Sequence, residues 1–91
     1  MIIRHPVEDY NRWKKEFDGF LEKRRAAGER TFRVAHLTTD KNNHCLMFDW
    51  DGAAIAKRFL DSSELAAVMK RAGVAEKPEV YIAEDLVSGR T

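Results

Sequence analysis

The sequence predicts an α+β fold with the split βαβ, or ferredoxin-like, element order β-α-β-β-α(α)-β. Three observations predict it. A long amphipathic helix follows a short first strand, a hairpin follows that helix, and two further helical segments precede a last strand. In this arrangement the sheet has four antiparallel strands in the order 4-1-3-2. Right-handed crossovers place the helices on one face, so the other face is left bare.

The first third of the chain supplies the first strand and the long helix. Residues 2–5 open with two isoleucines and end before Pro6, which predicts a short strand. Glu8 or Asp9 is expected to cap the helix, because either acid suits its positive end. Inward positions step by three and four along roughly 17 residues, and the helix is expected to end near Gly28. These inward positions are Tyr10, Trp13, Phe17, Phe20, Leu21 and Arg24.

The rest of the chain predicts a hairpin, two short helices and a last strand. Residues 31–39 and 44–50 are predicted strands, and the Asp and Asn residues at 40–43 favour a turn between them. A helical region then starts near Asp51-Gly52. Ser62 or Ser63 is expected to cap a further helix that Gly73 ends. Pro78 precedes a last predicted strand over residues 79–87.

The predicted strand over residues 44–50 is apolar on both faces. Leu46, Phe48 and Trp50 alternate on one face, while Cys45 and Met47 share the other with Asp49. A strand with one wet face alternates apolar and polar residues, and this strand largely does not. A short chain supplies one layer of helices. The second face therefore needs a second copy of the chain, another partner or a ligand.

Length and composition indicate one globular domain over residues 1–87, with residues 88–91 as a loose tail. The chain has 91 residues, of which 44% are hydrophobic and 34% charged, and its net charge is +1. That charge gives no general attraction to nucleic acid or to a membrane surface. We expect no signal peptide and no membrane span. The single cysteine, Cys45, excludes an intrachain disulfide and suits the cytoplasm.

The histidines are the candidate catalytic groups, because a neutral imidazole is a general base near neutral pH. If the hairpin loop has an even number of residues, His36 shares a face with Asp49, whose carboxylate would fix its tautomer. This less apolar face is expected to point to an interface or cavity. His5, at the junction of strand and helix, would either cap the helix or line a pocket mouth. His44 adjoins the turn and is expected to be solvated.

Each candidate also has a simpler structural interpretation. The sequence favours a simpler explanation of His36, as a hydrogen-bonded histidine at an interface. The three histidines lack the short spacing of a metal motif, so no metal site is expected. Side chains expected to line an aromatic pocket are Phe32, Met47, Trp50 and Tyr81, with Tyr81 on the bare face. Trp13 and Phe17 are expected in the core. A basic cluster of Lys23, Arg24, Arg25, Arg30 and Arg33 is expected to be solvated.

Three stretches resemble a known family. They are Val7-x-Asp9-Tyr10-x-x-Trp13-x-x-x-Phe17-Asp18, the strand ending in Trp50, and Phe59-x-x-Ser62-x-x-Leu65-x-x-x-Met69-x-x-Ala72-Gly73-Val74-x-x-x-Pro78. Their order and spacing resemble the dimeric α+β barrel superfamily, and within it the small antibiotic-biosynthesis-monooxygenase-like proteins. The resemblance covers residues 1 to about 87. It implies a homodimer in which two sheets pack face to face, with a cavity beside the helices or between the sheets.

The resemblance also bears on activity. Some relatives oxidise polycyclic phenols without metal or flavin, so no cofactor is expected, although the Asn-Trp arrangement of those oxygenases has no match here. The resulting hypothesis is a dimeric, cofactor-independent monooxygenase-like enzyme, or a binder of a small aromatic ligand. The alternative is a non-catalytic dimeric structural or regulatory domain. An RNA-binding domain shares the element order, but residues 44–50 lack the glycine and basic residue of its third strand.

Overall fold

Four strands form one antiparallel sheet in the computed structural model, which describes residues 1–91. Its order is β2-β3-β1-β4, which confirms the predicted α+β, ferredoxin-like topology. The strands are β1 (Ile2–Pro6), β2 (Glu29–Leu37), β3 (Asp40–Trp50) and β4 (Glu79–Tyr81). The central strands are therefore β3 and β1. No helix of the structure is long and apolar enough to cross a membrane.

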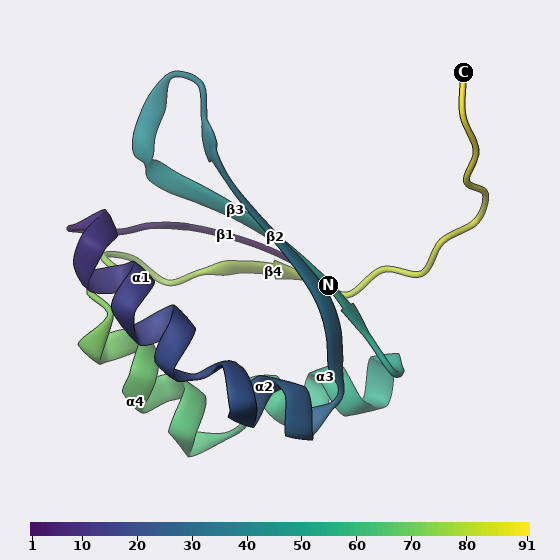
Figure 1. Ribbon diagram of the computed structural model, residues 1–91, viewed down its shortest axis with the longest axis horizontal. Helices are drawn as coiled ribbons and strands as arrows, with labels where there is room; N and C mark the ends of the chain where they lie inside the picture. The colour runs from purple at the N-terminus through teal and green to yellow at the C-terminus, as the bar shows by residue number, and fades with distance from the viewer.

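Four helices lie on one side of this sheet, and the other side is bare (Figure 1). The helices are α1 (Tyr10–Gly19), α2 (Leu21–Ala27), α3 (Ala53–Leu60) and α4 (Ser63–Arg71). The expected caps are present: Asp9 accepts the N–H of Asn11 at 3.0 Å, and Ser62 accepts that of Leu65 at 3.2 Å. A buried cluster of Val7, Trp13, Leu46, Phe48 and Ala72 joins the two layers.

The first helix is broken, whereas the sequence predicts one continuous helix. The break falls at Phe20, directly after Gly19, a residue of low helix propensity. Phe20 is buried and its ring centroid lies 5.9 Å from that of Phe59 on α3. The break thus turns an aromatic side chain toward the other pair of helices.

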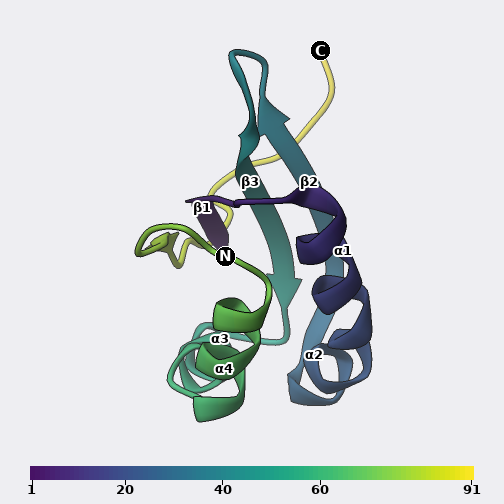
Figure 2. The ribbon, with the colours of Figure 1, turned by 90° about the vertical axis from the view of Figure 1, so that its left-hand side faces the viewer.

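The hairpin turn lies two residues earlier than predicted. Strand β3 begins at Asp40, and the turn is formed by residues 38 and 39. Leu37 pairs with Asp40 but His36 pairs with His44, so the register shifts between these neighbours. A register shift changes which side chains share a face. His36 consequently shares a face with His44, and the expected shared face of His36 and Asp49 is wrong. Figure 2 shows this hairpin projecting beyond the helices.

Strand β4 is shorter than the predicted strand over residues 79–87. Tyr81 pairs with Ile2, the first residue of β1, so only Met1 remains as a partner for a longer β4. Residues 82–91 form no helix or strand. They lead away from the sheet as the tail at the right of Figure 1, and the side chains of Leu86 and Val87 are fully or almost fully exposed.

Gly28 is the C-cap residue of α2 and directly precedes β2. Its φ is 122°, and an added Cβ would lie 2.8 Å from Cγ2 of Ile55. We predict that Gly28→Ala lowers the free energy of unfolding by about 1–3 kcal/mol, because it combines backbone strain with overpacking. Gly19→Ala is the control, since its Cβ would meet nothing within 4 Å. Urea unfolding measures both variants. Equal stability of the two would contradict the prediction.

Candidate functional site

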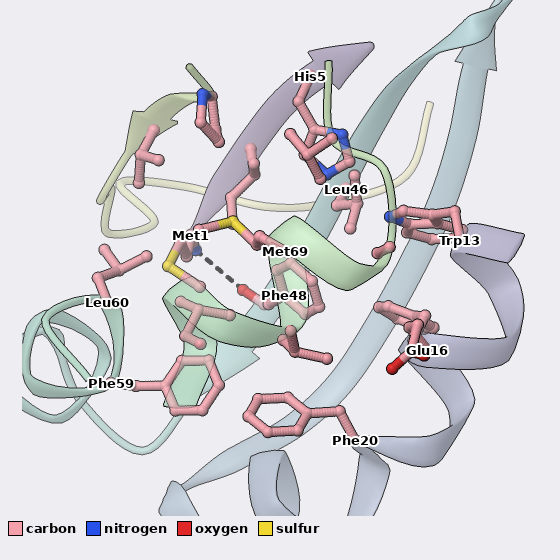
Figure 3. A pocket seen from close by; sticks show the side chains of 18 of the residues that line it. Met1, His5, Trp13, Glu16, Phe20, Leu46, Phe48, Phe59, Leu60 and Met69 are labelled. Carbon is pink, nitrogen blue, oxygen red and sulfur yellow. Dashed lines mark hydrogen bonds between the residues drawn. The ribbon is translucent and has the colours of Figure 1, made fainter. Parts of the chain in front are cut away.

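A cavity of about 250 Å³ lies between the sheet and the helices (Figure 3). Fifteen of its 20 lining residues are hydrophobic, so it suits an apolar guest. The lining residues are Met1, Ile3, His5, Trp13, Glu16, Phe17, Phe20, Glu29, Leu46, Phe48, Phe59, Leu60, Leu65, Val68, Met69, Ala72, Val74, Lys77, Pro78 and Val80.

Strand alternation decides which sheet residues reach this cavity. Ile3, Leu46 and Val80 are paired across β1, β3 and β4 and face the helices together. Their neighbours in sequence point to the bare face. At the start of β1 the amino group of Met1 donates a hydrogen bond to the Phe48 carbonyl of β3 at 2.9 Å, drawn dashed in Figure 3. This bond holds the start of the chain beside the cavity.

Two histidines lie side by side in the buried layer. His5 and His44 are paired across β1 and β3, with 4% and 2% of their surfaces exposed. Their ring centroids are 6.3 Å apart, and Trp13 packs edge-on against His44 at 4.8 Å. Neither Nδ1 atom has a hydrogen-bond partner. The expectation of a solvated His44 is wrong, because β3 starts earlier than predicted and carries His44 under α1.

Burial lowers the pKa of both imidazoles. For His5 the proximity of His44 lowers the pKa further. Both rings are therefore neutral at pH 7, and a neutral ring can accept a proton. Only His5 lines the cavity, and its ring lies near Trp13 and Leu46 in Figure 3.

A buried ion pair forms another polar part of the site. Arg24 Nη1 lies 3.1 Å from Glu29 Oε2, and the two side chains are 5% and 4% exposed. Arg24 also donates to the Phe17 carbonyl at 3.2 Å, and its guanidinium lies 3.7 Å from the centroid of the Phe17 ring. Burial raises the pKa of Glu29, whereas Arg24 opposes that rise. Glu29 lines the cavity, whereas Arg24 contacts Glu29 without lining the cavity.

The prediction that Arg24 belongs to a solvated basic cluster is wrong. Its position on the inward stripe of the helix, seven residues after Phe17, was the available signal for burial. Glu29 gave no comparable signal in the sequence. Another lining carboxylate, Glu16, is closer to the surface and pairs with Arg71 Nε at 3.4 Å.

The structure does not bring His36 and Asp49 together. They lie on opposite faces of the sheet because of the register shift in the hairpin. The His36 side chain is exposed, and its Nδ1 lies 2.8 Å from the Leu37 carbonyl. Asp49 accepts a hydrogen bond from the Thr31 hydroxyl on the bare face. The expected carboxylate–imidazole pair is therefore absent.

The four predicted aromatic-pocket residues do not converge, and none of them lines the cavity. Met47 and Tyr81 lie on the bare face, as expected for Tyr81. Phe32 packs edge-on against Phe17 at 5.2 Å, and Trp50 packs against Phe59 at 4.9 Å. Phe32 and Trp50 therefore contact two residues of the cavity wall, Phe17 and Phe59, without lining the cavity themselves. No three His, Cys, Asp or Glu side chains are placed to hold a metal ion.

Solved structures with the same architecture are found in several bacteria. A candidate antibiotic biosynthesis monooxygenase from Bordetella bronchiseptica matches with a TM-score of 0.78 at 15% identity, covering 94% of both chains. A Mycobacterium tuberculosis protein matches with a TM-score of 0.70 at 12% identity, covering 98% of this chain and 95% of its own. SnoaB, a cofactor-independent oxygenase from Streptomyces nogalater, matches with a TM-score of 0.58 at 14% identity, covering 97% of this chain and 94% of its own.

The fold is that of antibiotic biosynthesis monooxygenase-like proteins. At these identities the likeness establishes the fold alone, and the activity of a neighbour does not carry over with it. No protein-family model matches the sequence, and no curated protein matches it.

Because burial lowers the pKa of His5 and His44, the unfolded chain takes up more protons as the pH falls below the ordinary value of 6.5. We predict that stability is full above pH 6.5 and falls progressively below it. A variant carrying both His5→Leu and His44→Leu should lose less stability than the parent over this range, because it lacks the two buried imidazoles. Urea midpoints measured across this pH range test this. Identical pH profiles for the double variant and the parent would contradict it.

Proposed function

We propose that the protein binds a small aromatic or hydrophobic ligand in the cavity and oxidises it as a cofactor-independent monooxygenase-type enzyme. The observation that carries this proposal is an apolar cavity with one neutral, unpartnered imidazole, that of His5, in its wall. The fold shared with SnoaB, an oxygenase of that type, supports it.

The size of the cavity indicates the size of the ligand. An apolar cavity of about 150 Å³ accommodates benzene, and ligand pockets start at about 300 Å³. A cavity of about 250 Å³ therefore suits a ligand of one or two aromatic rings. The stacked rings of Trp13 and Phe17, with centroids 4.8 Å apart, offer an aromatic wall for such a ligand.

His5 is the proposed general base. Its unpartnered Nδ1 would take the proton of an acidic phenol or carbon acid. The deprotonated ligand would then reduce dioxygen itself. One oxygen atom would enter the ligand and the other would leave as water, with all four electrons coming from the ligand. His36 and Asp49 have no part in this proposal, because neither lies in the cavity wall.

We further propose that the bare face is the interface of a homodimer. Ile2 and Tyr81 on this face are 43% and 57% exposed, and Met47 lies opposite Ile2 in the β1–β3 pairing. The ion pair between Arg4 and Glu79, 2.5 Å apart, borders this apolar area. Such an arrangement of apolar centre and polar border is typical of a protein interface. A cytoplasmic location fits the free Cys45 on the same face.

The enzymatic proposal predicts two linked results. Phenolic compounds of one or two rings should raise the melting temperature of the protein, and at least one of them should be consumed together with dioxygen. His5→Gln should keep the thermal shift but lower the rate of oxygen uptake by about 10²-fold or more, because it removes the base. An oxygen electrode and a thermal-shift assay measure the two quantities.

Leu65→Trp tests whether the ligand binds in the cavity, because the larger side chain fills the cavity from α4. Ala66→Trp, at an exposed position of the same helix, is the matched control. Only the first should abolish the thermal shift. A thermal shift without oxygen uptake would favour a non-catalytic binding or regulatory domain. No shift with any compound would contradict the ligand proposal.

The dimer proposal predicts that the parent chain sediments as a dimer at micromolar concentration. Met47→Arg should yield monomers, because it places a charge in the centre of the apolar interface. Ala54→Arg, at an exposed position of α3, is the matched control and should stay dimeric. A monomeric parent chain, or a dimer that tolerates Met47→Arg, would contradict this interface.

A further inference from the structure

We propose that Glu29, held in place by Arg24, is the polar anchor that selects the ligand of the cavity. It would favour a planar apolar molecule carrying a hydrogen-bond donor, such as a hydroxyl or an amine, and would reject a carboxylate. This inference rests on the proposed ligand-binding function. It assigns the cavity a specificity-determining residue that is distinct from the proposed base, His5.

An irregularity in β2 turns Glu29 toward the cavity. Glu29 pairs with Trp50 while Thr31 pairs with Asp49, so Arg30 is an extra residue in β2. The Arg30 side chain points outward to Asp51, with its two hydrogen bonds at 2.6 and 2.5 Å. In a regular strand Glu29 would share the bare face with Thr31. The extra residue places it on the helix side instead, a change of direction that β-bulges commonly produce next to functional sites.

The carboxylate of Glu29 retains unused hydrogen-bonding capacity. An ionised carboxylate offers about four acceptor positions. A single nitrogen, Arg24 Nη1, approaches its two oxygens, at 3.3 and 3.1 Å. No other group donates to it, and its side chain is 96% buried in a cavity wall that is otherwise mostly apolar. Burying an acceptor without its partners is unfavourable. A donor on the ligand would supply a missing partner.

Arg24 is arranged to hold this carboxylate, and it is not itself a wall residue. Its guanidinium is fixed from behind by the Phe17 carbonyl and by the rings of Phe17 and Phe32, at 3.7 and 5.2 Å. A ligand in the cavity therefore meets the negative member of the pair first. A ligand carboxylate would be repelled there, whereas a hydroxyl or amine would be bound.

The test compares three probes built on the same two-ring frame: naphthalene, 2-naphthol and 2-naphthoate. Equilibrium dialysis measures their dissociation constants for the full chain. We expect 2-naphthol to bind about tenfold more tightly than naphthalene, as a hydrogen bond to a charged acceptor provides, and 2-naphthoate to bind most weakly.

Two variants test whether Glu29 causes the preference for 2-naphthol over naphthalene. Glu29→Gln should reduce it to a few-fold, because a neutral acceptor replaces the charged one. The double variant Arg24→Leu with Glu29→Leu should abolish it while naphthalene still binds. Replacing both members of a buried pair by apolar residues commonly preserves folding. Glu16→Gln, the other lining carboxylate, is the matched control and should keep the preference.

The binding results distinguish failure of the role of Glu29 from failure of the ligand proposal. Binding of naphthalene without a preference for 2-naphthol in the parent chain would overturn the role of Glu29 and leave the ligand proposal standing. A preference that survives in the double variant would also overturn it. Failure of all three probes to bind would overturn the ligand proposal, and the inference about Glu29 with it.

Discussion

The central strands β1 and β3 carry apolar side chains on both faces, and the chain has helices for only one of them. Leu46 and Phe48 are buried under the helices, while Met47 between them and Ile2 beside it face outward. Burial of apolar surface is the main driving force for both folding and association. This alternation divides the molecule into a helix side that encloses the cavity and a bare side that we propose binds a second copy.

Two irregularities in the β2–β3 pairing then decide where the polar side chains of β2 lie. The extra residue Arg30 in β2 brings Glu29 into the cavity wall. The shift between His36 and Leu37, where β3 holds the extra residues, places His36 on the helix side but outside the cavity, in the hairpin that projects past the helices. His5 needs no such irregularity, because it continues the alternation of β1 from Ile3. Both polar groups of the proposed site thus follow from backbone register.

The element order, the strand order and the helix caps could be predicted from the sequence, because Asp9, Ser62, Gly28 and the apolar stripes act locally. The site could be predicted only in part. Burial of His44 and the separation of His36 from Asp49 depend on a register shift that no local sequence pattern predicts. The burial of Arg24 was available from its position on the helical stripe, but its charge favoured the solvated interpretation.

The three methionines of the chain test this division of the sheet directly. Met1 and Met69 line the cavity, and Met47 lies on the bare face. Methyl NMR spectra of the methionines, recorded during a naphthalene titration and during dilution of the protein, separate the two sides. We predict that naphthalene shifts the signals of Met1 and Met69, and that dilution shifts the signal of Met47. Naphthalene shifting Met47 alone, or dilution leaving Met47 unchanged, would contradict it.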